Sequence, residues 1–195
     1  MAYYPIFLEL SGLPCLVIGG GQVAFHKTKA LLACGARVTV VSPSLLSSAL
    51  SHVERQGAIQ WRRRPFRAGD LKGMLLVVAA TNEKSVNLLA AKEAKRKGIF
   101  INVVDQPALC SFIVPSVVRR GRLVLAISTG GVSPALAKWI RKDLEKRYGR
   151  ETARLVSGMA RARRGILKRV RGVARRKALF EKALKAYFRV LKEGE

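Results

Sequence analysis

The stretch Leu16-Val17-Ile18-Gly19-Gly20-Gly21-Gln22-Val23-Ala24 decides the fold of the first half of the chain. Its apolar start predicts a buried strand, and the G-x-G-x-x-A pattern after it predicts a tight turn into a helix that ends near Cys34. Gly19 permits the turn, Gly21 lets the backbone approach a diphosphate, and Ala24 lets helix and strand pack closely. A diphosphate would bind the free N–H groups at the positive end of that helix. The alternative for this pattern is a glycine turn that binds no ligand.

Strands and helices alternate along the part of the chain that follows. The apolar or β-branched runs that predict strands span residues 37–41, 59–61, 75–80 and 99–104. Between them the sequence predicts a helix over residues 44–56, with Ser44 as its N-cap, and another over residues 83–97. This alternation indicates an α/β fold in which helices cover both faces of a parallel sheet.

Ligands of such folds bind beyond the carboxyl ends of the strands, here at the loops Ser42-Pro43-Ser44 and Thr81-Asn82. A usual NAD site has an acidic residue after the second strand, where it binds the adenosine ribose. This chain has none there, so Ser42, Ser44 and backbone groups would bind the ribose, and the choice between NAD and NADP stays undecided. Thr81-Asn82 is placed to lie near the nicotinamide ribose.

Asp105 is the only carboxylate that directly follows a core strand at this edge of the sheet. A lone carboxylate beside a cofactor acts as a general base or binds a metal. The structural alternative is an aspartate that caps the turn before Pro107. Cys110 lies close by in sequence without a partner base, so we expect a buried or site-lining thiol and not a nucleophile. We expect no catalytic role for His26 or His52.

The pattern changes after residue 107. Phe112–Val118 and Leu123–Ile127 predict a β-hairpin, and Ser133 is the expected N-cap of a helix that has Pro134 in its first turn. The small-residue loop 128–134 favours an anionic ligand group, or is an ordinary strand-to-helix turn. A hairpin and one helix cannot bury both of their faces, so we expect a second subunit to cover them.

Charge is the most unusual bulk property of the 195 residues. Lys and Arg number 37 against 12 Asp and Glu, a net charge of +25, and ten of the basic residues fall between residues 152 and 180, where no acidic residue occurs. From Tyr148 onward the sequence predicts two or three short helices that form a small domain. Such a charge indicates a polyanionic partner, or a solvated basic surface of the kind found in thermophiles. We expect Arg62-Arg63-Arg64 to be a solvated loop, with a carboxylate contact as the alternative.

The remaining composition bounds the class of protein. A hydrophobic content of 49% excludes wholesale disorder, and no apolar run approaches the roughly 20 residues of a membrane span. The N-terminus lacks the pattern of a signal peptide. Three cysteines without C-x-x-C spacing predict a reducing cytoplasm and no structural zinc or other metal site.

Six motifs then point to one family. They are Pro5-Ile6-Phe7, Gly19-Gly20-Gly21-x-Val23-Ala24, Ala79-Ala80-Thr81-Asn82, Asn102-Val103-Val104-Asp105, Ser111-Phe112-Ile113-x-Pro115-Ser116 and Ser128-Thr129-Gly130-Gly131-x-Ser133-Pro134. Their combination resembles precorrin-2 dehydrogenase, the sirohydrochlorin-forming part of siroheme synthases, over residues 4–147 and more loosely beyond. The resemblance implies a Rossmann-type NAD-binding domain over residues 1–111, a dimerisation region over 112–147 and a small basic helical domain over 148–195. It also implies the stand-alone form, without the methyltransferase that is fused to some bacterial members.

The same resemblance implies an NAD-dependent oxidation of precorrin-2 to sirohydrochlorin by a homodimer, and in some members insertion of ferrous iron at the same site. Asp105 matches the catalytic aspartate. The expected cofactor-binding residues are Gly19, Gly21, Gln22, Val23, Ala24, Ser42, Pro43, Ser44, Thr81 and Asn82. The expected substrate-binding residues are Asn102, Ser128, Thr129 and Gly130.

Precorrin-2 carries eight carboxylates, so a basic cleft would attract it. Two rival functions stay in view. One is a Rossmann-type nucleic-acid-binding protein, which the net charge favours although no recognition motif is present. The other is a ferrochelatase without dehydrogenase activity, against which the intact Gly19–Ala24 turn argues.

Overall fold

The structure is a computed structural model that describes the backbone of residues 3–192 and the side chains of residues 3–186. It divides into two compact units that meet in sequence at Val114 and Pro115. The second unit holds the basic helices and all but the first three residues of the predicted dimerisation region. The division into three domains therefore stays a prediction, and the last three residues of its third domain lie outside the described part.

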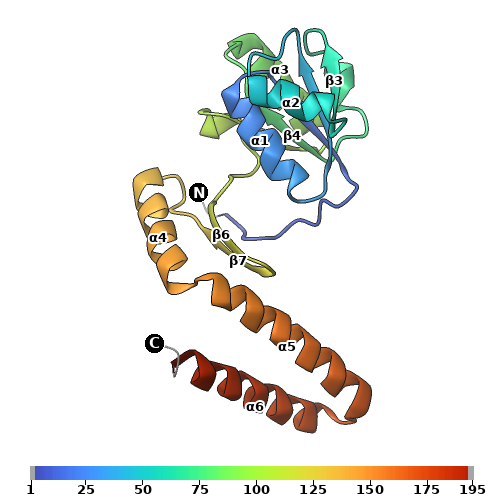
Figure 1. Ribbon diagram of the computed structural model, residues 1–195. Helices are drawn as coiled ribbons and strands as arrows, with labels where there is room; N and C mark the ends of the chain where they lie inside the picture. The colour runs from blue at the N-terminus through green and yellow to red at the C-terminus, as the bar shows by residue number, and fades with distance from the viewer. Residues whose placement is uncertain (1–2, 193–195) are drawn as a thin grey trace. The chain divides into compact units, whose positions relative to one another are not determined.

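The first unit, drawn from blue to yellow-green in Figure 1, contains a five-stranded parallel sheet. Its strand order is β3-β2-β1-β4-β5. Its strands are β1 (Pro14–Ile18), β2 (Arg37–Ser42), β3 (Ile59–Arg63), β4 (Leu76–Ala79) and β5 (Phe100–Val103). Its helices are α1 (Gln22–Leu32), α2 (Ser48–Arg55), α3 (Lys84–Arg96) and the 3-10 turns η1 (Ala68–Leu71) and η2 (Pro107–Leu109). The expected α/β fold is confirmed. The strand order reverses between β1 and β4, and a ligand crevice forms at such a reversal.

Two hydrophobic cores hold the sheet between the helices. Cys15 and Val17 of β1 pack with α1 and α2 on one face, whereas Leu16 and Ile18 pack with α3 on the other. All four side chains are at most 2% exposed. Successive residues of a strand point to opposite faces, so an unbroken apolar run is what a strand covered on both sides requires.

The helix expected over residues 44–56 begins later, at Ser48, and its N-cap is Ser47 and not Ser44. The Leu50 backbone N–H donates to Ser47 Oγ at 3.3 Å. The backbone N–H groups of Leu46 and Ser47 donate to the Gly20 carbonyl at 2.9 and 3.1 Å. This segment therefore packs on the glycine turn, and helix formation starts only after it.

The second unit contains the antiparallel hairpin β6 (Ser116–Arg120) and β7 (Leu123–Ile127), against which α4 (Pro134–Arg147) packs. Ser133 caps α4 as expected, since the Leu136 N–H donates to Ser133 Oγ at 3.1 Å. The basic region forms two 20-residue helices, α5 (Arg150–Arg169) and α6 (Val173–Lys192), and not two or three short ones. No proline interrupts either helix, and Gly158 and Gly165 lie inside α5 instead of ending it.

The arginine run 62–64 is not a solvated loop. Arg62 and Arg63 belong to β3, and the guanidinium groups of Arg62 and Arg64 bind the carboxylate of Asp70 at 2.9 and 2.5 Å. Asp70 follows β3 in η1 and is 3% exposed. The contact was hidden in the sequence because the turn after β3 brings Asp70 back beside the strand. The carboxylate that Arg62 and Arg64 bind therefore belongs to the protein itself and not to a ligand.

Replacing Asp70 with asparagine should lower the free energy of unfolding at pH 7 by about 2 kcal/mol. Burial raises the pKa of the Asp70 carboxyl, but hydrogen bonds from Arg64, the Arg67 backbone and Arg62 outweigh burial and lower the pKa from 3.8 to about 2. A lowered folded-state pKa stabilises the protein above about pH 4, and this contribution disappears as the pH falls toward 2. Urea unfolding at several pH values should show the difference between wild type and variant shrinking over that interval. A constant difference would contradict this account.

Among the residues that the structure describes, no helix has both the length and the apolar composition needed to cross a membrane.

Candidate functional site

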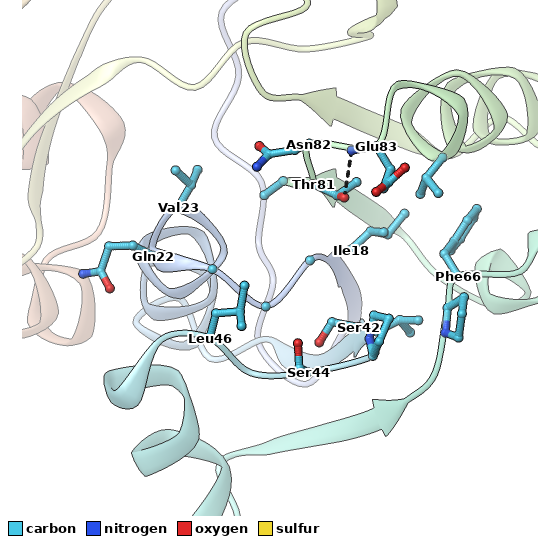
Figure 2. A pocket seen from close by; sticks show the side chains of 18 residues that line it. Ile18, Gln22, Val23, Ser42, Ser44, Leu46, Phe66, Thr81, Asn82 and Glu83 are labelled. Atoms are coloured by element: carbon cyan, nitrogen blue, oxygen red, sulfur yellow. Dashed lines mark hydrogen bonds between the residues drawn. The ribbon is translucent and has the colours of Figure 1, made fainter.

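A pocket of about 670 Å³ lies at the carboxyl ends of β1, β2 and β4 (Figure 2). Figure 2 shows Gln22 and Val23 at one side of it, Phe66 at the other, and Ser42 and Ser44 across from the Thr81 loop. Nine of the ten residues expected to bind a cofactor line this pocket. The tenth, Ala24, is fully buried beneath it in α1. The structure therefore brings the predicted cofactor residues together in one place.

Packing within the chain requires a glycine at two positions of the turn, Gly19 and Gly20, and not at Gly21. Gly19 has a φ of +124°, and a Cβ atom there would lie 2.2 Å from the Ala80 carbonyl oxygen. A Cβ atom on Gly20 would lie 2.0 Å from the Ser44 carbonyl oxygen. Gly19 and Gly20 thus permit close packing of β1 against the loops after β4 and β2. A Cβ atom on Gly21 would meet nothing within 4 Å, so packing within the chain does not require a glycine there.

The N-terminus of α1 directs unpaired donors toward this free space. The first N–H groups of a helix have no partner inside the helix, and they attract anions. Gly21 is the N-cap of α1, and no side chain caps it. A diphosphate beside Gly21 would occupy the volume that a side chain would otherwise fill.

Ser42 lies where the sheet meets the expected adenosine end of the pocket. Its side chain is 4% exposed, and within the described residues its Oγ has no hydrogen-bond partner. Trp61 Nε1 donates to the Ser42 carbonyl at 3.1 Å and ties β3 to the end of β2. A buried hydroxyl without a partner is destabilising, so a ligand or water that supplies one is favoured.

The charge of the pocket differs from that of the rest of the chain. In the described structure no Lys or Arg lines it, and Glu83 is its single acidic residue. The Glu83 backbone N–H donates to Thr81 Oγ1 at 3.2 Å (Figure 2). Basic residues make up 37 of 195 in the sequence, so about three would be expected among 18 lining residues by chance. The pocket therefore attracts anionic groups through backbone N–H groups and not through cationic side chains.

Asp105 lies in the turn that follows β5, two residues beyond Val103, and does not line this pocket. It is exposed and has a φ of 59°, the only positive φ of a non-glycine residue in the described chain. The preceding Val104 N–H donates to the Ala79 carbonyl at 2.9 Å, which fixes Asp105 one strand away from the Thr81 loop. Holding a non-glycine residue in the left-handed region costs free energy, and such strain gathers at functional sites.

Cys110 makes hydrogen bonds to residues on both sides of Asp105 and so stabilises the loop that carries it. Its Sγ accepts from the Val103 N–H at 3.2 Å, and it lies within hydrogen-bonding distance of the Val103 and Gln106 carbonyls. Asn102 is 9% exposed, and its amide donates to the Phe112 carbonyl at 3.1 Å. Cys110 is therefore a structural thiol at the edge of the site, and the substrate-binding role of Asn102 stays a prediction.

The remaining predicted substrate-binding residues belong to one loop. Ser128, Thr129 and Gly130 lie in the second unit, where Thr129 Oγ1 accepts from the Ser133 N–H and donates to the Ser133 carbonyl. Ser128 Oγ accepts from the Gly130 N–H at 3.1 Å. This loop is shaped by its own hydroxyl groups, and its substrate-binding role stays a prediction.

Neither histidine lies in a catalytic arrangement. His26 and His52 are exposed on α1 and α2. The side chain near His26 is that of Gln22, whose Nε2 lies 3.4 Å from His26 Nε2 and whose Oε1 accepts a hydrogen bond from Ser47 Oγ at 3.0 Å. Burial, with a contribution from Cys34, raises the pKa of the Cys15 thiol to about 11, so it is not a nucleophile. In the described part of the chain, no group of three or more His, Cys, Asp or Glu residues could hold a metal ion.

Sequence reasoning missed several pocket residues. Gly20 was detectable, because it stands between the two glycines of the pattern. Pro65 and Phe66 line the far end of the pocket after β3, and no sequence signal marked them. They lie between Arg64 and Arg67, which both contact Asp70, and these contacts form only in the folded chain.

Comparison with known proteins gives consistent results over both units. The chain matches the family described as putative NAD(P)-binding over residues 6–116, and the family described as sirohaem biosynthesis protein central over residues 120–147. Siroheme synthase of Methylococcus capsulatus is 46% identical over 145 residues, 74% of this chain and 30% of that protein. Siroheme synthase 1 of Aeromonas salmonicida is 40% identical over 186 residues, 95% of this chain and 40% of that protein. The solved structure of SirC, a precorrin-2 dehydrogenase, has a TM-score of 0.79 and 28% identity, and covers 98% of this chain and 100% of its own.

Fold and pocket together define a dinucleotide-binding protein of the Rossmann class. The chain belongs to the family described as putative NAD(P)-binding. Over nearly its whole length it is also similar to siroheme synthase 1 of Aeromonas salmonicida and to SirC. Its cofactor is accordingly a nicotinamide dinucleotide, and the free space at Gly21 and the unpartnered Ser42 hydroxyl fit one. The chain spans 30% to 40% of the length of these two curated siroheme synthases.

Proposed function

We propose that this protein oxidises precorrin-2 to sirohydrochlorin with NAD, a step of siroheme biosynthesis. The observation that carries the proposal is the dinucleotide pocket at the Gly19–Ala24 turn, together with Asp105, whose backbone is strained and which follows β5, two strands away from β1. The similarity to SirC, whose name states the same activity, supports it, as do the siroheme synthase relatives.

NAD and not NADP is the proposed dinucleotide. The 2′-phosphate of NADP is usually held by an arginine near the end of β2. In the described chain no Lys or Arg lines the pocket, and Ser42 and Ser44 occupy the end of β2. Hydroxyl groups suit a ribose diol but leave a phosphate without a counter-charge.

Two hydrogens leave precorrin-2, one as a hydride and one as a proton. When bound, the nicotinamide ring accepts the hydride. We assign the proton to the carboxylate of Asp105, which lies at the same edge of the sheet. The protein otherwise holds the two reactants in register: Gly21 and α1 bind the diphosphate, Ser42 and Ser44 the adenosine ribose, and Thr81-Asn82 the nicotinamide ribose. Asn102 and the loop 128–130 are the proposed contacts of the tetrapyrrole.

The basic helices α5 and α6 are proposed to attract the carboxylates of the substrate. Changing Arg163, Arg164 and Lys168 together to glutamine should raise the KM for precorrin-2 at least about fivefold and leave kcat within twofold. All three side chains are exposed. The same change at the exposed Lys72, Lys92 and Lys95 is the matched control and should leave the KM unchanged. If both triple variants raise the KM equally, net charge alone explains the effect. If the first variant does not change the KM, α5 does not contribute to substrate binding.

Three finer points belong to the same proposal. The second unit, with exposed Val117, Leu136 and Trp139, is proposed to pair with a second copy of the chain. Ferrous iron is proposed as an additional substrate, inserted into sirohydrochlorin to give siroheme. The reducing cytoplasm stays the predicted location. Iron insertion into supplied sirohydrochlorin without NAD measures the chelatase reaction separately.

The experiment that tests the proposal is anaerobic incubation of the protein with precorrin-2, with NAD or with NAD omitted, followed by mass spectrometry. We expect a tetrapyrrole lighter by two hydrogens only when NAD is present. The same product in both incubations would mean that precorrin-2 oxidises without NAD. Unchanged precorrin-2 in both incubations would show that the protein is not a precorrin-2 dehydrogenase.

A further inference from the structure

We propose that Asp70 sets the dinucleotide preference of this pocket, because it holds Arg62 and Arg64 away from the position that a 2′-phosphate would occupy. This inference rests on the proposed use of NAD and deepens it. It assigns a specificity-determining role to a residue that does not line the pocket.

The two arginines lie beside the adenosine end of the pocket. In the parallel register of β2 and β3, Val41 is paired with Arg62 and Ser42 with Arg63, so Arg64 follows directly beyond the end of β2. The next residue, Pro65, lines the pocket, and Arg64 Nη1 donates to its carbonyl at 3.0 Å. An arginine in this place is the usual ligand of a 2′-phosphate.

Asp70 uses the full hydrogen-bonding capacity of its carboxylate on this segment. Oδ1 accepts from Arg62 Nη1 at 2.9 Å and from Arg64 Nη2 at 2.5 Å. Oδ2 accepts from Arg64 Nη1 at 2.8 Å and from the Arg67 N–H at 2.9 Å. A carboxylate has about four lone-pair positions, and all four are occupied here. The side chain of Asp70 is 2% exposed, so water does not compete for these bonds.

The same contact engages both arginines and offsets one of their two positive charges, and neither arginine lines the pocket. Arg64 commits three of its five N–H donors to Asp70 and the Pro65 carbonyl, so the paired donors of its Nη1–Nη2 edge are not free to bind a phosphate. The side chains of Arg62 and Arg64 are nevertheless 34% and 33% exposed, so they could turn toward solvent once released. Loss of the Asp70 charge would then create the cation that the pocket lacks.

The test compares the Kd values of NAD and NADP, measured by calorimetry at neutral pH, in wild type and in Asp70→Asn. We expect wild type to bind NAD at least tenfold more tightly than NADP. Asp70→Asn should lower the Kd for NADP at least tenfold and change that for NAD less than threefold. Adding Arg62→Gln and Arg64→Gln to the variant should abolish the gain.

Glu93→Gln is the matched control. It also removes one negative charge and releases an arginine, Arg96, which Glu93 Oε2 binds at 2.8 Å on α3, and neither residue lines the pocket. The Kd ratio should stay at its wild-type value in this variant. An equal gain in NADP affinity from Glu93→Gln would show a general charge effect and overturn the inference, as would an unchanged ratio in folded Asp70→Asn.

If Asp70→Asn does not fold, Arg64→Gln provides the test. In Arg64→Gln the Asp70 carboxylate keeps two hydrogen-bond donors, Arg62 and the Arg67 N–H, so we expect this variant to fold. An NADP Kd within twofold of wild type supports the inference, and a tenfold weakening overturns it, since Arg64 would already be binding the 2′-phosphate. Failure of the proposed cofactor is distinguishable from both results, because wild type would then not bind NAD at all.

Discussion

Replacing Asp105 with asparagine should lower kcat for precorrin-2 oxidation at least about 100-fold, while the Kd for NAD stays within twofold. A positioned general base contributes about 100-fold to 10,000-fold. Asp105 lies in the turn after β5, outside the dinucleotide pocket, so its loss should affect proton removal and not cofactor binding. Asparagine is the informative substitute because it keeps the shape and tolerates the φ of 59°. Steady-state kinetics and NAD calorimetry measure the two quantities.

Asp105→Ala serves as the comparison. A Cβ-bearing residue without a polar side chain is strained at this φ, so alanine should also lower the free energy of unfolding, by about 1 kcal/mol. Asparagine should leave stability nearly unchanged. Full turnover by folded Asp105→Asn would show that the carboxylate is not the base, and a parallel rise in the NAD Kd would mean that it acts through the cofactor site.

Replacing Gly21 with alanine should raise the Kd for NAD about 50-fold without loss of stability. A Cβ atom at Gly21 meets no atom of the protein, and its φ of −86° suits any residue. The added methyl group would instead occupy the space where a diphosphate approaches the backbone, and lost hydrogen bonds to a charged group cost about 1.5–3 kcal/mol. NAD calorimetry and urea unfolding measure the two effects.

Gly20→Ala is the matched contrast one residue earlier. Its Cβ atom would lie 2.0 Å from the Ser44 carbonyl oxygen, so the fold should lose about 2 kcal/mol or more. A Gly21→Ala variant that binds NAD normally would mean that the diphosphate does not approach this turn. Equal destabilisation by both substitutions would mean that Gly21 has a packing role that the structure does not show.

The part of the fold that sequence reasoning predicted is the part governed by local patterns. The Leu16–Ala24 stretch specifies strand, turn and helix through residues adjacent in sequence, and the apolar runs mark the strands because both faces of the sheet are buried. The same local logic placed nine predicted cofactor residues at one pocket, since parallel strands end at a common edge.

Contacts between segments distant in sequence were not predictable in this way. Ser47 and not Ser44 caps α2, because the Gly20 carbonyl binds the backbone of the loop between them. Arg62 and Arg64 resemble a solvated basic run until the turn after β3 returns Asp70 to them. The length of α5 and α6 was also not predicted, because glycine often ends a helix and two glycines lie within α5.

The contrast between the pocket and the rest of the chain gives the net charge a specific meaning. A chain with a charge of +25 lines its dinucleotide pocket with backbone N–H groups, hydroxyls, amides, apolar side chains and the single acidic residue Glu83, and not with basic side chains. Most of the positive charge lies in the second unit, on α5 and α6 above all. We therefore expect the charge to act on a polyanionic substrate and not on the cofactor.

The most direct test of the proposed activity is a single-turnover absorbance measurement. The purified protein is mixed anaerobically with precorrin-2 and NAD in the absence of metal. We predict that the sirohydrochlorin spectrum appears together with one NADH for each tetrapyrrole converted. NAD binding by the folded protein without any NAD-dependent change in the tetrapyrrole spectrum would contradict the account.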